Sequence, residues 1–427
     1  MMGRMAREET RTTTSPHIRS SAPSEPPGAT PRAWPTRLLV LGIVLAAVNL
    51  RPAITSLGAL LEEVRDGLGM SGSMAGLLTS VPPLCFAFFG VMAPRLARRF
   101  GPGAVVCAGM VAITAGLLIR PYTGSTVGFL AASALALMGI AVSNVLMPVI
   151  VKRWFPDRVG TMTGLYSMAL ALGTATAAAV TVPVTDRLGG SWQTGLAVWS
   201  GLAAAAVLPW IPSIRQRGTA SAAEAPAREE QPALRITRSR TAWALAVFFG
   251  LQATAAYITM GWMAQIFRDA GVPASTAGLL LAVTMVMGVP LAFVIPRVAT
   301  RLPHQGPIVL VLGVCGLAGY AGLYFAPASG AWAWALLLGV SNCAFPLALT
   351  MVGMRARTGA GVAQLSAFAQ STGYLISIPG PLLVGVLYQH SGGWGLPIAL
   401  MAALMVPQMA VGVLAGRDRT VEAEAAR

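Results

Sequence analysis

Arg51 is the residue whose type and position point most directly to chemistry. It lies about 13 residues into an apolar run over 38–60, which corresponds to about 20 Å along a helix. A guanidinium stays charged at any relevant pH and offers five hydrogen-bond donors. Burying it among apolar groups costs a few kcal/mol or more unless a cavity or a partner receives it. Pro52 follows directly and cannot donate to the carbonyl of Val48, so the sequence predicts a kinked helix at this point.

No acidic partner for Arg51 is evident. All 15 Asp and Glu residues fall in tails, loops or the ends of apolar runs, and His17, His304 and His390 lie outside the middle of any run. The chain therefore lacks an evident proton relay at membrane depth. We expect Arg51 to contact a small anionic or electron-rich solute. The alternative is a structural role, in which it binds backbone carbonyls or extends to the outer interface.

Further polar side chains interrupt other apolar runs. One run carries a helically spaced stripe of Ser366, Gln370, Gly373, Tyr374 and Ser377. Such groups either line a cavity or form hydrogen bonds between helices, and the sequence leaves both open. The predicted substrate-binding residues are Arg51, Asn49, Tyr166, Gln252, Tyr257, Gln370, Tyr374, Asn144 and Asn342.

The elements that position these residues are long apolar segments. Hydrophobic residues make up 55% of the chain and charged residues only 11%, too little polar material for a soluble domain. The runs lack the alternation of a membrane barrel, so each predicts a membrane-spanning helix of about 20 residues. The twelve runs are 38–60, 74–94, 103–120, 126–151, 160–184, 193–212, 241–266, 275–296, 307–327, 331–354, 361–388 and 394–415.

Basic residues mark one side of this layout. Of the 30 Lys and Arg residues, 25 fall on the side of the N-terminus and 4 on the other side. The positive-inside rule then places both termini in the cytoplasm and the chain in the cytoplasmic membrane. This accounts for the net charge of +15, so we expect no nucleic-acid partner. The predicted parts are a disordered tail over 1–36, a six-helix bundle over 37–212, a linker over 213–240, a second bundle over 241–416 and a tail over 417–427.

The two halves repeat. Ala75-Gly76-Leu77-Leu78 matches Ala277-Gly278-Leu279-Leu280, and Ser143-Asn144-x-x-x-Pro148 matches Ser341-Asn342-x-x-x-Pro346. The matched segments run in the same direction through the membrane. Parallel repeats of six helices imply two bundles related by an axis along the membrane normal, with a site between them near the midplane. The predicted fold is therefore an all-α polytopic membrane protein of two pseudo-symmetric bundles.

Two loops carry a family resemblance. The loop Pro94-Arg95-Leu96-Ala97-Arg98-Arg99-Phe100-Gly101 resembles the G-x-L-A-D-R-x-G loop of the major facilitator superfamily, and Arg153-Trp154-Phe155-Pro156-Asp157-Arg158 is similar to another loop common there. The resemblance implies a gating role for Arg95, Arg98, Arg99, Asp157 and Arg158 at the cytoplasmic face. Arg98 stands where the family's acidic residue usually lies, which puts charge pairing there in doubt.

Other residues point to one family within this superfamily. Three segments resemble the cyanate and 2-nitroimidazole transporter family (CynX/NimT). They are Asn49-Leu50-Arg51-Pro52, Ala75-Gly76-Leu77-Leu78-Thr79, and Gly250-Leu251-Gln252 with Tyr257 and Trp262. The resemblance covers essentially the whole membrane portion. It implies that the arginine binds a small anionic or electron-rich solute.

These patterns predict a secondary transporter rather than an enzyme or an ATP-driven pump. No phosphate-binding loop is present, and the four cysteines have no metal-ligand spacing. We expect no cofactor and no metal; the partners are a small-molecule solute and the lipid bilayer, and the chain is expected to be a monomer. The alternatives left open are a proton-coupled drug-type efflux antiporter and a non-transporting membrane sensor. Import or efflux is not specified.

Overall fold

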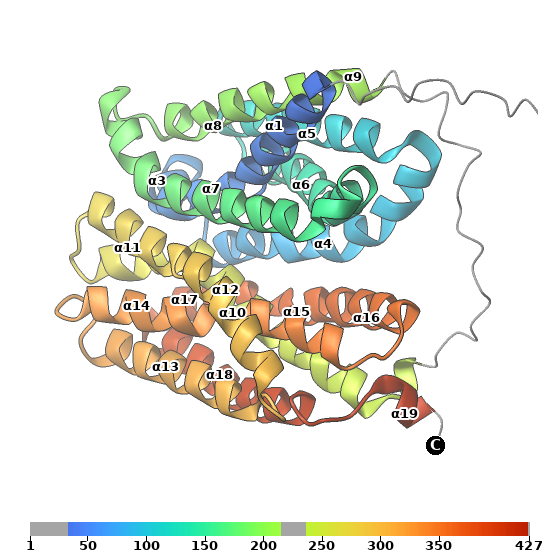
Figure 1. Cartoon of the computed structure of the whole chain (residues 1–427). Coiled ribbons are helices and arrows are strands. Elements are labelled where there is room, and N and C mark those ends of the chain that lie inside the picture. Colours follow the sequence, from blue (N-terminus) through green and yellow to red (C-terminus); the bar gives the residue numbers. More distant parts are fainter. Residues whose placement is uncertain (1–32, 215–235, 426–427) are drawn as a thin grey trace, which may run out of the picture.

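The computed structural model describes residues 33–214 and 236–425, and within these ranges every regular element is a helix (Figure 1). The all-α prediction is confirmed. Most of the predicted N-terminal tail (1–32) and of the linker (215–235) lies outside the described residues, as do 426–427. The first helix begins at Ala33, and a helical turn at Ile236–Arg238 precedes the seventh predicted span.

The helices of the first half lie together in the upper part of Figure 1. They are α1 (Ala33–Asn49), α2 (Pro52–Ala59), α3 (Leu61–Leu68), α4 (Gly72–Phe100), α5 (Pro102–Ile119), α6 (Thr126–Trp154), α7 (Val159–Arg187), α8 (Trp192–Val207) and α9 (Ile211–Ile214). We refer to this set as the N-terminal bundle.

The helices of the second half lie in the lower part of the same view. They are α10 (Arg240–Asp269), α11 (Ala274–Val286), α12 (Gly288–Arg301), α13 (Gly306–Phe325), α14 (Ala331–Asn342), α15 (Ala344–Met354), α16 (Gly359–Ser377), α17 (Pro379–Ser391), α18 (Gly395–Ala415) and α19 (Val421–Ala425). We refer to this set as the C-terminal bundle.

The predicted spans correspond to these helices with one difference. Among the described residues, 11 helical stretches, some of them divided into two helices, are long and apolar enough to cross a membrane. The predicted run over 193–212 is interrupted instead: α8 has 16 residues and continues through a 3-10 turn at Leu208–Trp210 into α9. Pro209 has no N–H to extend the α-helical hydrogen bonds, which explains why this span is broken into short pieces.

Four other spans break near the middle of their length. The breaks separate α1 from α2, α11 from α12, α14 from α15 and α16 from α17. In every case a proline lies within the first three residues of the second piece: Pro52, Pro290, Pro346 and Pro379. Proline lacks the N–H that would continue the first piece and is favourable in the first turn of a new one. The prolines therefore set where each span is divided.

The repeated glycine has an equivalent role in both halves. A Cβ on Gly76 of α4 would lie 2.8 Å from the carbonyl oxygen of Leu382 on α17, and a Cβ on Gly278 of α11 would lie 2.5 Å from that of Ala178 on α7. Each contact joins one bundle to the other. Glycine at these two sites lets helices from different bundles meet backbone to backbone, which explains why the motif recurs.

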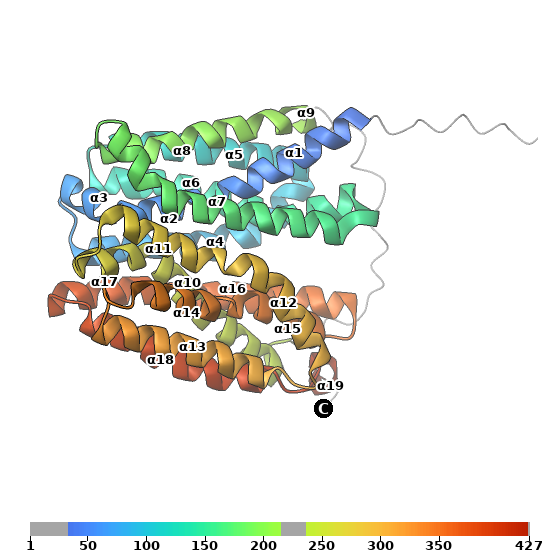
Figure 2. The same cartoon turned by 60° about the vertical axis from the view of Figure 1, so that its left-hand side comes forward.

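The molecule has two distinct ends (Figure 2). The linker end is where α9 and α19 lie, and the opposite end is where α3 and the turn after α17 lie. At the linker end, α19 attaches to α10: Glu424 accepts hydrogen bonds from Ser239 Oγ at 2.6 Å, Thr241 N at 3.1 Å and Thr241 Oγ1 at 2.8 Å. Burial alone would raise the pKa of Glu424, but these bonds hold it below its ordinary value.

Candidate functional site

Arg51 lies at the break in the first span, as the sequence predicts. Helix α1 ends at Asn49, Pro52 begins α2, and Arg51 between them has φ −127° and ψ −25°. The carbonyl of Arg51 accepts hydrogen bonds from the backbone N–H of Ile54 at 2.9 Å and of Thr55 at 3.1 Å. The chain therefore restarts as a helix directly after Arg51, and the predicted kink is confirmed.

The Arg51 guanidinium faces helices of both bundles. It lies near the Tyr257 hydroxyl of α10, and Tyr374 of α16 and Tyr166 of α7 also contribute to its electrostatic surroundings. Its Cζ lies 5.8 Å from the centre of the Phe86 ring on α4, within the range of a cation–π contact. The side chain is half-buried. These neighbours place Arg51 between the bundles, away from the lipid-facing surface.

No protein group neutralises this charge within the described ranges. No carboxylate forms an ion pair with Arg51 there, and no main-chain oxygen accepts a hydrogen bond from its guanidinium. The alternative of a clamp on backbone carbonyls therefore lacks support in this geometry. A charge at this depth needs a cavity or a partner, and the protein supplies only hydroxyl groups and aromatic rings.

A series of packed aromatic rings begins beside the guanidinium. Tyr374 packs on Phe86 at a centroid distance of 5.1 Å and on Phe249 of α10 at 5.2 Å. Phe249 contacts Phe345 of α15 at 5.9 Å. Sequence reasoning missed Phe86, Phe249 and Phe345, because a phenylalanine in an apolar helix gives no contrast with its neighbours. The arrangement combines one cation with ring faces that can pack against a flat solute.

Tyr166 and Asn144 act as a pair. The Tyr166 hydroxyl donates to Asn144 Oδ1 at 2.6 Å. Since a phenol has a single proton to donate, its lone pairs remain to accept from Arg51. The two residues were predicted separately, and the structure brings them together. Asn144 supports Tyr166, and its repeat partner Asn342 has a different environment.

Helix α16 carries the predicted stripe into the site. Gln370 lies one turn before Tyr374 and donates from Nε2 to Ser366 Oγ at 2.8 Å. Ser377 instead donates to the Tyr374 carbonyl of its own helix at 2.8 Å and is fully buried. Tyr374 therefore lies among the neighbours of Arg51, whereas Gln370 is bonded to Ser366 and Ser377 to its own helix.

Asn49 is bonded within the N-terminal bundle. Although it is two residues from Arg51, its Nδ2 donates to the carbonyls of Leu45 at 2.8 Å and of Leu202 in α8 at 3.2 Å. Both acceptors belong to the N-terminal bundle. Asn49 therefore joins α1 to α8, and its part in substrate binding stays a prediction.

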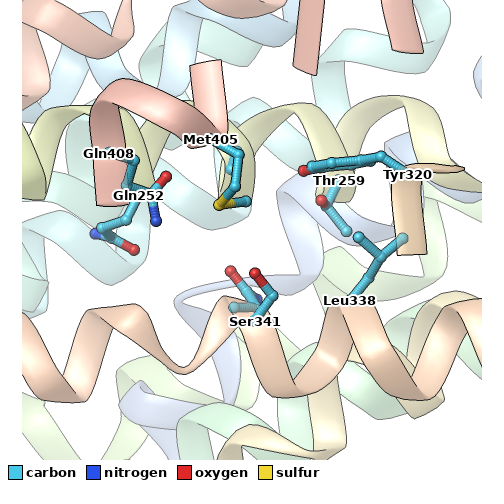
Figure 3. Close-up of a pocket in the computed structure, with 9 residues that line it drawn as sticks. Gln252, Thr259, Tyr320, Leu338, Ser341, Met405 and Gln408 are labelled. Carbon is cyan, nitrogen blue, oxygen red and sulfur yellow. The ribbon is translucent and has the colours of Figure 1, made fainter. Parts of the chain in front are cut away.

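Gln252 and Asn342 share one environment. Both line a small pocket inside the C-terminal bundle, together with Thr259, Tyr320, Ser341 and Gln408 (Figure 3). Gln252 and Tyr257 are five residues apart, or about 140° around a helix. They occupy different faces of α10, so only Tyr257 reaches Arg51.

Most of the chain matches a known protein family. Residues 39–377 match the family model described as Major Facilitator Superfamily. The chain belongs to this superfamily. It is a multi-pass membrane protein of a transporter family, and within that family it resembles the cyanate and nitroimidazole transporters.

Three relatives are similar along nearly their whole length. The chain is 35% identical to the uncharacterized transporter YycB of Bacillus subtilis, covering 90% of this chain and 94% of that protein. It is 32% identical to the 2-nitroimidazole transporter of Escherichia coli, covering 90% of this chain and 96% of that protein. It is 28% identical to the cyanate transport protein CynX of E. coli, covering 87% of this chain and 96% of that protein.

Solved structures agree in fold. The nucleoside transporter NupG superposes with a TM-score of 0.70 at 14% identity, covering 88% of this chain and 98% of that one. The inward-open xylose transporter XylE from E. coli gives 0.71 at 11% identity, covering 91% and 98%. At these identities the likeness establishes the fold alone.

In this transporter, charged and aromatic groups close the opposite end. Arg268 of α10 forms ion pairs with Glu62 and Glu63 of α3, both at 2.9 Å. Gln389 of α17 accepts hydrogen bonds from the N–H and hydroxyl of Ser73 on α4, at 2.9 and 2.7 Å. These contacts join the two bundles between the site and the opposite end.

The opposite end also has hydrogen bonds within the C-terminal bundle. Asp269 accepts from Tyr388 Oη at 2.9 Å, Trp394 Nε1 at 2.8 Å and Gln265 Nε2 at 2.7 Å. Trp262, which is fully buried, donates across the interface to Thr79 Oγ1 at 3.1 Å. Sequence reasoning had placed these acidic residues at helix ends but had not paired them.

The linker end differs. No hydrogen bond or ion pair joins the two bundles there, as far as 33–214 and 236–425 are concerned. The predicted gating residues Arg95, Arg98, Arg99, Asp157 and Arg158 are exposed at that end. Arg99 covers the ring of Phe100 at 5.2 Å, and none of the five forms an ion pair in the described chain. The structure does not bring them together as a closed gate.

Proposed function

We propose that this chain is a secondary transporter that moves a small anionic or polar aromatic solute, nitroaromatics included, across the cytoplasmic membrane, with Arg51 as its main recognition group. The observation that carries this proposal is a guanidinium at the bundle interface that has hydroxyl and aromatic neighbours but no carboxylate partner among the described residues. Because a lone charge at this depth is costly, a solute that brings negative charge or lone pairs is stabilised there.

The neighbours of Arg51 fit such a solute. The guanidinium offers a planar set of donors to oxyanions or nitro groups. Phe86 and Tyr374 offer ring faces beside it. Tyr257 and Tyr166 supply hydroxyls that can adapt to either a donor or an acceptor on the solute.

The relatives support the same solute class. One relative is described as a 2-nitroimidazole transporter and another as a cyanate transport protein. Nitroimidazole is a polar aromatic compound and cyanate is a small anion, so a cation beside aromatic rings suits both. The relatives thereby favour this class over other solutes of the superfamily.

Alternating access accounts for the two ends. In a two-bundle transporter, the bundles rock around a central site. The contacts at the opposite end hold it closed, while the described residues form no such bonds between the bundles at the linker end. Given the basic residues on the linker side, we assign that end to the cytoplasm, so this conformation is inward-facing.

The proposal is tested with Arg51→Gln in purified protein reconstituted into liposomes. Charge-assisted hydrogen bonds contribute about 1.5–3 kcal/mol, so binding of the transported solute should weaken roughly 10- to 150-fold. The solutes to screen are cyanate, 2-nitroimidazole and a panel of small carboxylates, by thermal shift and then by flux without ATP.

The matched control is Arg187→Gln, which removes an exposed arginine at the end of α7. It should leave binding and flux unchanged. If Arg51→Gln remains folded and transports every bound solute at the wild-type rate, the proposal is wrong.

A further inference from the structure

The short helix α2 determines where Arg51 points, yet it is not continuous with either neighbouring helix. It has eight residues, Pro52–Ala59, and all eight are buried. The span is interrupted before it at Arg51 and again after it at Leu60. Eight residues make about 12 Å of helix. Contacts with other elements must therefore fix the position of α2, and the orientation of Arg51 depends on them.

One buried side chain binds a face of α2 from within the N-terminal bundle. Arg120 follows the end of α5, begins the 3-10 turn Arg120–Tyr122 and is 1% exposed. Its Nη1 donates to the Ala53 carbonyl at 2.9 Å, and its Nη2 donates more weakly to Ser56 Oγ at 3.4 Å. Residues three apart lie on one face of a helix. A single guanidinium therefore spans nearly one turn of α2.

Arg120 is a buried charge without an acidic partner. No carboxylate in 33–214 or 236–425 pairs with it, and its buried Nε has no hydrogen-bond partner there. The Phe129 ring of α6 lies 5.9 Å from its Cζ. Burying an ionised guanidinium is costly, and an apolar side chain would fill the space without that cost. What an arginine adds is a set of directed donors, and these bind α2.

The C-terminal bundle contacts the other end of the same helix. A Cβ on Gly58 would overlap the Met260 carbonyl oxygen of α10, so the two backbones touch where the bundles meet (Figure 2). Arg268 of α10 donates to the Ala59 carbonyl at 3.5 Å. Helix α2 therefore lies between an arginine of each bundle. When the opposite end opens, α2 must separate from one of them.

The contacts with Arg120 are the stronger ones. Its 2.9 Å bond to Ala53 has an ordinary length for an N–H···O bond, whereas 3.5 Å for Arg268 is beyond the usual range. Arg268 also divides its donors between Glu62 and Glu63, and its side chain is 15% exposed. Water can replace the contact of Arg268 with α2, but it does not reach Arg120.

We propose that Arg120 is a positioning residue for transport, which anchors α2 to the N-terminal bundle so that Arg51 moves with this bundle. Arg51 then keeps its place beside Phe86 and Tyr166, which belong to the same bundle, and separates from Tyr257 and Tyr374 when the opposite end opens. This inference rests on the proposed function in one respect, namely that Arg51 binds the solute.

The first test needs no solute. In hydrogen–deuterium exchange of the purified full chain, Arg120→Met should make the amides of α2 exchange at least about tenfold faster, because the helix loses its anchor. Arg120→Lys, which keeps the charge and one donor group, should give an intermediate rate. Wild-type exchange of α2 in both variants would overturn the proposal.

The matched control is a second buried arginine that also binds main-chain carbonyls. Arg355 is 2% exposed and donates to the carbonyls of Ala415 at 3.0 Å and Gly416 at 2.8 Å, at the linker end. Arg355→Met should lower the transition temperature, as Arg120→Met does. It should leave the exchange of α2 as in wild type, since Arg355 does not touch this helix.

The second test asks whether Arg120 acts through Arg51. Binding of 2-nitroimidazole should weaken about tenfold in Arg120→Met and should not change in Arg355→Met. In the Arg51→Gln background, Arg120→Met should have no further effect, because residues that act as a unit are not additive. A full tenfold loss in both backgrounds would overturn the proposal. If Arg51→Gln binds solute as wild type does, the proposed function fails, and the exchange of α2 still decides whether Arg120 is its anchor.

Discussion

The ion pairs at the opposite end provide the sharpest prediction for alternating access. Arg268 is bonded to Glu62 and Glu63 across the bundle interface, at 2.9 Å in each case. The conformation that opens this end must separate these charges. We expect Arg268→Gln to shift the population toward that conformation.

The size of this population shift depends on how exposed the three charged side chains are. The Arg268 side chain is 15% exposed, and those of Glu62 and Glu63 are 40% and 32% exposed. Partly exposed pairs contribute up to about 1 kcal/mol each. Losing both costs up to about 2 kcal/mol, which changes the ratio of closed to open molecules by up to about 30-fold.

Pulsed electron paramagnetic resonance can measure that ratio. Spin labels on Asp66→Cys and Ser391→Cys report the distance across the opposite end, since both positions are exposed and belong to different bundles. The four native cysteines, of which three are buried, must first be replaced. A longer distance should gain population in Arg268→Gln.

Two further variants make the result specific. Glu62→Gln combined with Glu63→Gln should reproduce the shift, because it removes the same two pairs from the other partner. Arg187→Gln, which removes an exposed charge at the same end, should not. Equal distance distributions in wild type, Arg268→Gln and the double glutamine variant would refute the assignment of these residues as a gate.

Three other variants test separate parts of the structure. Gly278→Ala should lower the transition temperature because its Cβ would lie 2.5 Å from the Ala178 carbonyl, whereas Gly201→Ala, with open space around it, should raise stability by about 0.5–1 kcal/mol. Tyr166→Phe removes the bond to Asn144 and an acceptor beside Arg51, so solute affinity in a binding assay should fall about fivefold, by about 1 kcal/mol; an unchanged affinity would exclude Tyr166 from the site. Glu424→Gln should weaken attachment of α19 by about 1 kcal/mol, seen as faster hydrogen exchange at the start of α10. Because the pKa of Glu424 is lowered in the folded chain, its contribution is full above the ordinary value of 4.5 and is lost as pH falls through the lower folded value; Glu424→Gln should therefore abolish that part of the pH dependence.

Much of the fold could be predicted because it depends on composition and on proline. Long apolar runs predicted the spans, and Pro52 predicted the break that presents Arg51. The run over 193–212 was less regular than expected because Pro209 divides it. Arg120 shows another limit. Its apolar run ends there, so it was counted with a loop, but the side chain is 1% exposed and donates to the Ala53 carbonyl at 2.9 Å.

The site was predictable in part. The sequence identified Arg51, Tyr166, Tyr257 and Tyr374, since polar groups stand out in apolar helices. It could not say which face of α10 points to the centre, because α10 is buried on nearly all sides. Gln252 and Tyr257 therefore looked alike. Asn49 looked like a site residue because of its nearness to Arg51 along the chain, yet the break turns it toward α8.

The positive charge of Arg51, which has no carboxylate partner among the described residues, also has an electrical consequence. Moving one elementary charge through a full membrane potential of 100 mV changes its energy by about 2.3 kcal/mol. As the bundles alternate, the field falls first on one side of Arg51 and then on the other. Voltage therefore favours the empty carrier in the state that opens to the negative compartment. An anionic occupant cancels the charge at Arg51 and with it this preference, so loading at Arg51 alone would make the conformational step electrically silent.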